Sequence, residues 1–136
     1  MSAPFVHRLR VRYHECDQQG RVFNAHYFAY FDIALTELWR ETFGSYDAMR
    51  DYGCDLVVAE ATARFKGAAR FDEEVDVALL IAHLGDSSMR TDIEVRRDEE
   101  VLVEGRMVHV WVGAEDFAKR SIPAEARDRL APFTAS

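Results

Sequence analysis

Apolar and polar residues alternate at the start of the chain, from Phe5 to His14. One side of this stretch would carry Phe5, His7, Leu9, Val11 and Tyr13, and the other Val6, three arginines and His14. A period of two predicts a β-strand with one face in the core and one in water. The polar segment that follows, Glu15 to Gly20, is predicted to be a turn, because glycine adopts backbone conformations that other residues avoid.

The pattern changes at Asn24, where apolar residues begin to recur at steps of three and four. These positions are Tyr27, Phe28, Phe31, Ala34, Leu35, Leu38 and Trp39. The spacing predicts a helix of about four or five turns, with Asn24 as its N-cap and Phe43-Gly44 as its end. Polar residues occupy only part of its circumference, so we expect the helix to be largely enclosed.

Four extended segments follow a short helical piece at Tyr46 to Tyr52. They run from Leu56 to Lys66, Glu74 to Leu84, Met89 to Arg97 and Val101 to Val112. Turn-rich connections between them favour an antiparallel sheet, and the apolar helix must be covered by it. A short amphipathic helix ends near Leu130. The sequence therefore predicts an α+β fold in which a curved antiparallel sheet of about five strands wraps around one long central helix, within a single domain of residues 1–136.

Two features suggest that helix and sheet approach closely. The apolar side of the segment at residues 56–66 is predicted to carry small side chains, with Val57, Ala59, Ala61 and Ala63 before Phe65. Small side chains leave room for an aromatic helix. Gly105 marks either a bulge or a close contact in the last strand.

Composition and charge restrict the function. The chain has 136 residues, of which 49% are hydrophobic and 30% charged, as expected of a globular protein. A net charge of −7 argues against nucleic-acid binding, which needs a basic surface. The two cysteines form no CxxC pair, so neither a disulfide scaffold nor a structural metal site is expected. The expected location is the reducing cytoplasm. Without a run of about 20 apolar residues, neither export nor membrane insertion is expected.

Candidate chemistry is concentrated between Tyr13 and Phe31. His14, Cys16, Asp17 and His26 are all competent metal ligands, but their spacing matches no familiar zinc pattern, so no metal is expected. Cys16 could be a nucleophile served by His14 or His26. A lone cysteine near a histidine is more often a small hydrophobic residue.

Asp17 is the stronger candidate for chemistry. It precedes Asn24 by seven residues with Gly20 between them, so its carboxylate can face the start of the helix. The unpaired N–H groups and dipole there suit an oxygen that gains negative charge, and a carboxylate opposite such a site suits acyl chemistry. The other interpretation is that Asp17 only caps the turn or the helix, and spacing alone favours that one.

The run VRYHECDQQGRVFNAHYFAYFDIALTELWRE resembles the signature of the 4-hydroxybenzoyl-CoA thioesterase-like branch of hotdog-fold acyl-CoA thioesterases. The matching positions are Asp17 and Gly20 in a D-x-x-G turn, Val22-Phe23 as a hydrophobic pair, Asn24 and Tyr27 at the start of the helix, and Ala34 with Glu37 later in it. Later similarities are weaker, at Phe65-Lys66, at Gly85 to Ser88 and at Arg120 to Pro123.

The resemblance implies an acyl-CoA thioesterase that releases a free acid and CoA without a cofactor. It implies a homodimer or homotetramer with active sites at the subunit interface. Asp17 would then act as nucleophile or general base, and backbone amides from Asn24 to Tyr27 would polarise the thioester carbonyl. Many relatives carry histidine at the position of Asn24, and asparagine cannot exchange a proton at neutral pH. Either His26 compensates, or Asp17 and the amides suffice.

The predicted site residues fall into two groups. The catalytic group is Asp17, Asn24, His26 and Tyr27. The group that binds substrate and CoA is Gly20, Phe23, Arg64, Lys66, Ser88, Arg90, Lys119 and Arg120, in which the cations would meet phosphates. An acyl-carrier protein is an alternative source of the thioester, and no nucleic acid or membrane is expected as a partner. A hotdog enoyl-thioester hydratase or dehydratase, or a non-catalytic acyl-CoA-binding protein, is the alternative function.

Overall fold

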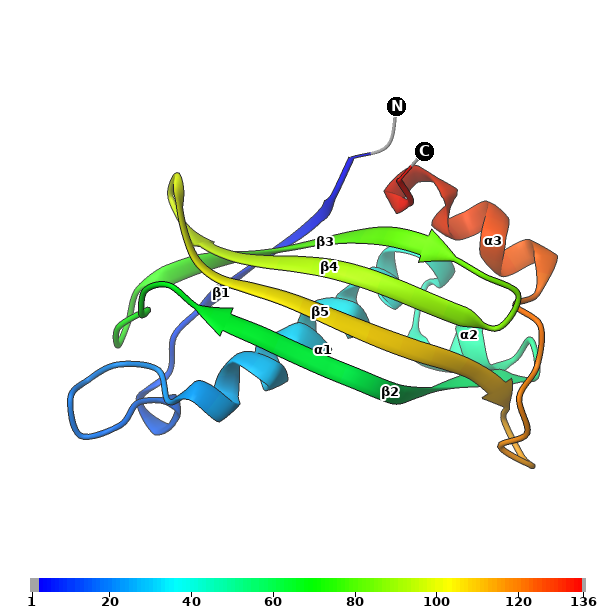
Figure 1. Cartoon of the computed structure of the whole chain (residues 1–136), viewed down its shortest axis with the longest axis horizontal. Coiled ribbons are helices and arrows are strands. Elements are labelled where there is room, and N and C mark those ends of the chain that lie inside the picture. The colour runs from blue at the N-terminus through cyan, green and yellow to red at the C-terminus, as the bar shows by residue number, and fades with distance from the viewer. Residues whose placement is uncertain (1–2, 136) are drawn as a thin grey trace.

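The fold is a five-stranded antiparallel sheet curved around one long helix, in a computed structural model that describes residues 3–135 (Figure 1). The strands are β1 (Phe5–Arg10), β2 (Cys54–Phe65), β3 (Glu74–Leu84), β4 (Ser88–Arg97) and β5 (Glu100–Gly113), in the spatial order β1-β3-β4-β5-β2. The helices are α1 (Asn24–Phe43), α2 (Tyr46–Arg50) and α3 (Ala124–Leu130), with 3-10 turns at Tyr13–Glu15 and Ala131–Phe133. The predicted α+β architecture is confirmed.

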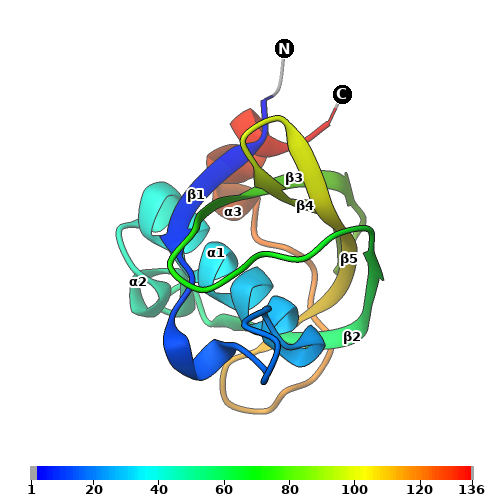
Figure 2. The ribbon, with the colours of Figure 1, turned by 90° about the vertical axis from the view of Figure 1, so that its left-hand side faces the viewer.

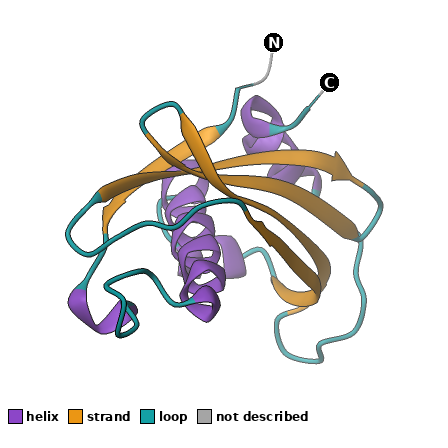
Figure 3. Cartoon of the chain, turned by 60° about the vertical axis from the view of Figure 1, so that its left-hand side comes forward, coloured by secondary structure: helices purple, strands orange, loops and turns teal. Residues whose placement is uncertain are grey.

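Helix α1 forms the centre of the core. Seven of its side chains are buried, namely Tyr27, Tyr30, Phe31, Ala34, Leu35, Leu38 and Trp39. They pack against the concave face of the sheet, which curves around one side of the helix (Figures 2 and 3). The opposite side of α1 is exposed at Asp32, Ile33, Thr36 and Arg40, so the helix is buried on one side only and the expected enclosure was wrong. None of the helices in residues 3–135 has the length and apolar content needed to span a bilayer.

Gly105 is the point of closest approach between the sheet and α1. A Cβ atom at this position would lie 2.5 Å from Cζ of Phe31, which is inside van der Waals contact. Gly105 pairs with Ala63 of β2, so two small residues lie side by side under the phenyl ring. Of the two interpretations of Gly105, the close contact is confirmed.

The predicted apolar face of β2 was wrong in its first half. The register between β2 and β5 shifts between Val58 and Glu60, so alternation is interrupted at Ala59. Leu56 and Val58 line a cavity together with α1, whereas Val57 does not. Beyond the shift, Ala63 packs against the core as predicted. A bulge inserts one residue and exchanges the faces, which a simple period of two does not represent.

Strand β1 also ends earlier than predicted, at Arg10 rather than His14. The chain turns into the 3-10 helix at Tyr13–Glu15, and the side chain of Tyr13 is 81% exposed. The helix start differs by one residue, because Phe23 is the N-cap and Asn24 is the first helical residue. The 3-10 turn lies next to the start of α1, because the N–H of Phe23 donates to the carbonyl of Glu15 at 2.9 Å.

Gly105→Ala is expected to lower the free energy of unfolding by about 1–3 kcal/mol, because the added methyl group overpacks against Phe31. Urea denaturation would measure the loss. In a double-mutant cycle with Phe31→Leu, the two changes should couple, since the smaller side chain relieves the clash. An unchanged unfolding midpoint in Gly105→Ala would contradict the close approach.

Candidate active site

Asp17 starts a tight turn that reverses the chain ahead of α1. Its Oδ1 accepts hydrogen bonds from the backbone N–H of Gln19 at 2.8 Å and of Arg21 at 3.4 Å. Gly20 completes the turn with a φ of +73° and donates its N–H to the carbonyl of Asp17 at 3.0 Å. Oδ2 makes no hydrogen bond within the described part of the chain. One carboxylate oxygen therefore caps the turn, as the simpler interpretation held, while the other stays available.

The turn borders an open cavity of about 680 Å³. Its lining consists of Tyr13, His14, Cys16, Asp17, Gln18, Gly20 and Phe71. The rings of Tyr13 and Phe71 meet edge to face with centroids 5.9 Å apart and form an apolar wall. The carboxylate of Asp17 thus lies where a partly apolar group could approach it.

The start of α1 lies directly after this turn and has no side-chain cap. The N–H of His26 donates to the carbonyl of Phe23 at 2.9 Å. The N–H groups of Asn24 and Ala25 have no acceptor in residues 3–135. Uncapped amides at the positive end of a 20-residue helix form a donor site for an oxygen with partial negative charge.

The predicted catalytic side chains differ in their surroundings. Asn24 is exposed, and His26 is half-buried with its ring centroid 6.5 Å from that of His14. Tyr27 is 1% exposed, and its hydroxyl accepts a hydrogen bond from the N–H of Ala69 at 3.0 Å. The hydroxyl of Tyr27 is therefore engaged in the core, away from the cavity next to Asp17.

A segment from Lys66 to Glu73 supports the turn and the helix start together. The N–H of Val22 donates to the carbonyl of Ala69 at 2.9 Å, and the N–H of Phe71 to that of Gly20 at 3.2 Å. Before the turn, the carboxylate of Glu15 accepts a hydrogen bond from the hydroxyl of Tyr30 at 2.7 Å. The turn is consequently held by backbone and side chains from three elements.

The alternative chemistries find less support in this arrangement. Burial, followed by the nearby carboxylates of Glu15 and Asp17, raises the pKa of the Cys16 thiol, which disfavours the thiolate. Its Sγ contacts the carbonyl of Arg12 at 3.7 Å. Within residues 3–135, no three His, Cys, Asp or Glu side chains gather closely enough to hold a metal ion.

Several cations lie at the same end of the molecule as Asp17. Lys66 follows Phe65, whose ring packs against Tyr27, and forms an ion pair with Glu104 at 2.8 Å. Arg64 is exposed on the outer face of the sheet. Arg21 and Arg70 face each other through an isolated β-bridge, are exposed, and form no ion pair with a described residue. Sequence reasoning missed these two arginines, because they are 49 residues apart and no local sequence pattern indicates that they lie side by side.

The remaining predicted residues lie elsewhere in the chain's fold. Ser88 and Arg90 belong to the start of β4, and Lys119 and Arg120 to the segment before α3, at the opposite end of the sheet in Figure 1. Arg120 donates to the carbonyl of Gly53. Phe23, at 53% exposure, does lie beside the turn. Within one chain, Ser88, Arg90, Lys119 and Arg120 are not brought together with Asp17.

Known proteins share both the sequence pattern and this architecture. Residues 19–111, more than half of the chain, match the family model of the thioesterase superfamily. The chain belongs to the thioesterase superfamily. The predicted hotdog family and the predicted class of enzyme, a thioester hydrolase, are thereby confirmed.

Individual relatives of this superfamily cover nearly the whole chain. The Escherichia coli acyl-CoA thioester hydrolase YbgC is 28% identical over 116 residues, covering 85% of this chain and 87% of that protein. The crystal structure of AQ1494 from Aquifex aeolicus is 29% identical, with a TM-score of 0.85 and coverage of 93% and 99%. That of the gentisyl-coenzyme A thioesterase BH1999 is 26% identical, with a TM-score of 0.81 and coverage of 91% and 98%.

A second, smaller cavity of about 240 Å³ lies between α1 and β2 of this superfamily member. Trp39, Leu56 and Val58 line it, together with His109 of β5. His109 is 3% exposed, and its Nδ1 has no hydrogen-bond partner in the described residues. Burial lowers the pKa of this imidazole to about 4, so His109 is neutral at physiological pH.

The free energy of unfolding is therefore expected to depend on pH through His109. The unfolded imidazole titrates near 6.5 and the folded one near 4, so the unfolded state binds more protons between these values. Stability should be complete above about pH 6.5 and should fall by up to about 3 kcal/mol as the pH drops to 4. Urea titrations at several pH values would measure this.

His109→Gln should remove most of that pH dependence, whereas His83→Gln, at an exposed position, should preserve it. Equal pH dependence in wild type and His109→Gln would contradict the role of His109.

Proposed function

We propose that the chain hydrolyses acyl-CoA thioesters to a carboxylic acid and CoA, with Asp17 as the reacting carboxylate. The observation that carries the proposal is a carboxylate at the lining of an open cavity, in a turn whose Cys16–Val22 bridge leads directly into an uncapped helix start. The names of related proteins, an acyl-CoA thioester hydrolase in Escherichia coli and a gentisyl-coenzyme A thioesterase, support the same substrate class.

The two oxygens of Asp17 have separate roles in this proposal. Oδ1, fixed by the amides of Gln19 and Arg21, orients the carboxylate. Oδ2 then faces the substrate. The thioester oxygen lies against the N–H groups of Asn24 and Ala25, which stabilise the negative charge that develops on it and which need no rearrangement during the reaction.

Two routes fit this geometry. In the first, Oδ2 takes a proton from water while the water oxygen attacks the carbonyl carbon, and collapse of the tetrahedral intermediate expels CoA thiolate, which then takes up the proton. In the second, Oδ2 itself attacks the carbonyl and expels the thiolate, and water hydrolyses the resulting mixed anhydride. Turnover in ¹⁸O-labelled water identifies the second route if label enters the Asp17 side chain, because this requires attack of water on the aspartyl carbon of the anhydride.

The side chains of Asn24 and His26 are assigned supporting roles. Asn24 is exposed at the first helical position, where its amide can donate to the thioester but cannot transfer a proton. His26 does not line the cavity and lies next to His14, which does. The oxyanion site is therefore assigned to the backbone amides, and the absence of a histidine at position 24 does not remove it.

Cations beside the turn are the proposed contacts for the CoA phosphates. Arg21 and Arg70 are exposed and are bridged through their backbones next to Asp17, and Lys66 directly follows the end of β2. Guanidinium groups bind phosphate oxygens through paired N–H donors. An acyl-carrier protein would present the same thioester on a phosphopantetheine arm and remains the alternative donor.

The enzyme is further proposed to work as a homodimer or a larger homo-oligomer with shared sites. Strand β2 is a 12-residue edge strand with β5 as its single neighbour in the sheet. Val57, Val58 and Phe65 on it are 38%, 54% and 43% exposed. A long apolar edge is a template for pairing with a second copy, and such pairing would cover the mouth of the smaller cavity at Val58.

Asp17→Asn is expected to lower kcat by roughly 10²–10⁴-fold in a thiol-release assay, because the amide can act neither as base nor as nucleophile. KM should change little. Asparagine keeps an oxygen for the Gln19 and Arg21 amides, so the variant should fold.

Glu41→Gln is the matched control, since it removes an exposed carboxylate at the other end of α1. The mechanism fails if folded Asp17→Asn retains most of its hydrolytic activity. Hydration of an enoyl-CoA without thiol release would instead identify a hydratase, and tight acyl-CoA binding without either reaction would identify a binding protein.

Val58→Glu is expected to yield monomers and to lower thiol release, because a charge on the β2 edge opposes strand pairing. Sedimentation velocity would report the oligomeric state. Val6→Glu places the same charge on the opposite edge strand, β1, where Val6 is 50% exposed, and should leave the assembly intact. Unchanged oligomers in Val58→Glu would exclude the β2 edge as the interface.

A further inference from the structure

The Ala68–Ala69 peptide unit lies between the β4–β5 hairpin and the candidate active site. Its N–H donates to the hydroxyl of Tyr27 in the first turn of α1, at 3.0 Å. Its carbonyl accepts a hydrogen bond from Nη1 of Arg97, at 3.2 Å. One peptide plane is thus bound on one side by a residue at the end of β4 and on the other by the helix start.

The next carbonyl along the segment holds the turn of Asp17. The carbonyl of Ala69 accepts from the N–H of Val22, between that turn and α1, at 2.9 Å. A rotation of the chain at residues 68–69 would therefore disturb the turn and the helix start together. The positions of the turn and of the helix start together set the distance between the Asp17 carboxylate and the amides of Asn24 and Ala25.

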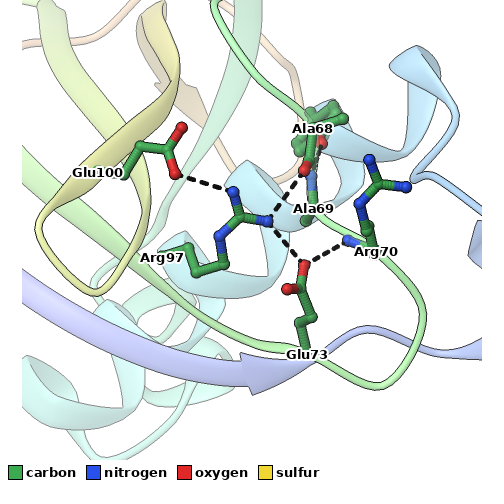
Figure 4. Close-up of polar contacts among 7 residues, drawn as sticks. Ala68, Ala69, Arg70, Glu73, Arg97 and Glu100 are labelled. Atoms are coloured by element: carbon green, nitrogen blue, oxygen red, sulfur yellow. Dashed lines mark hydrogen bonds and ion pairs between the residues drawn. The ribbon is translucent and has the colours of Figure 1, made fainter.

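Arg97 also binds the other end of this segment, through the carboxylate of Glu73 (Figure 4). Its Nη1 donates to Oε1 of Glu73 at 2.9 Å, and Nη2 to Oε1 of Glu100 at 2.8 Å. The same Oε1 of Glu73 accepts from the N–H of Arg70 at 2.7 Å. The guanidinium fork thereby ties both ends of the segment to the hairpin.

The surroundings make these contacts stronger than surface ion pairs. The side chains of Arg97 and Glu73 are 28% and 31% exposed, so both are partly shielded from solvent. Burial alone would raise the pKa of the Glu73 carboxyl, but the Arg70 N–H and the Arg97 guanidinium outweigh it and hold that pKa below its usual value. Charge-assisted bonds of this kind are about twice as strong as neutral ones.

We infer that Arg97 is a positioning residue for the active site, because its guanidinium orients the Ala68–Ala69 peptide unit that holds the Asp17 turn and the start of α1. Arg97 lies on the far side of that segment from the cavity and does not line it. A guanidinium on the carbonyl also polarises the amide and strengthens its N–H donation to Tyr27. This inference rests on the function proposed above for that site.

Arg97→Ala is the variant that tests the inference, and Arg96→Ala is its matched control. Arg96 is the neighbouring residue on the same strand, but it points to the exposed face and pairs with Glu94. Arg97→Ala should lower kcat roughly 10–100-fold, since a misplacement of about 1 Å costs on the order of 10²-fold, with KM changed less than twofold. Arg96→Ala should match wild type in both constants.

Two measurements distinguish positioning from mere stabilisation. The assay is run well below the melting temperature of each variant, and free guanidinium at non-denaturing millimolar concentration should restore part of the kcat of Arg97→Ala but not of Asp17→Asn. Arg97→Lys keeps the charge without the fork and should fall between wild type and Arg97→Ala. If Arg97→Ala does not fold, Glu73→Gln provides the test, because it loosens the same segment with Arg97 present.

Hydrogen exchange provides a readout that does not depend on activity. Amides in residues 17–24 and 66–73 should exchange faster in Arg97→Ala than in Arg96→Ala. Equal exchange in the two variants, or wild-type kcat in Arg97→Ala, would overturn the inference. A raised KM with unchanged kcat would also overturn it and would make Arg97 a substrate-binding group. If the wild type released no thiol from any acyl-CoA, the proposed function would fail while the exchange data still decided the role of Arg97.

Discussion

The burial of α1 is the constraint on which the rest of this structure depends. Seven of its side chains are buried, including three aromatic rings of Tyr27, Tyr30 and Phe31 that are at most 1% exposed. A sheet can cover such a helix only by curving around it, and β2 reaches the required curvature with a bulge after Val58. Backbone groups inside a helix are hydrogen-bonded to one another, so the ends of α1 are the places where backbone groups remain unpaired.

That geometry concentrates chemistry at the N-terminal end. The turn of Asp17 must enter α1 there, and the segment from Lys66 to Glu73 must leave β2 there to reach β3. Both connections lack regular strand pairing and satisfy each other's backbone groups instead, as in the bonds of Val22 and Phe71. The candidate site is therefore assembled from two loops whose positions follow from one helix and one sheet edge.

Sequence patterns anticipated the elements but not the contacts between them. The strand at Glu74–Leu84 has the predicted bounds and the helix at Asn24–Phe43 differs only by one residue at its start, because their periodicities are long and uninterrupted. The prediction that the first strand includes Tyr13 was wrong, and so was the prediction that Val57 faces the core. A turn and a bulge interrupt the structure at these places, although the apolar and polar residues continue to alternate in the sequence. No sequence pattern indicated a role for Arg97. Apart from Glu100, its partners lie 24 and 29 residues away, and one of them is a backbone carbonyl that any residue at position 68 would supply.

The uncapped start of α1 also has a thermodynamic consequence. Most helices satisfy their first amides with a side chain, at a gain of about 1 kcal/mol, and this helix forgoes that gain at Phe23. A bound oxygen, from a thioester or from the carboxylate product, would supply the missing acceptor and thereby stabilise the folded chain by mass action. Under the proposed mechanism, thermal stability and occupancy by ligand would be coupled through the same two N–H groups, and substrate would act as a transient cap of the helix.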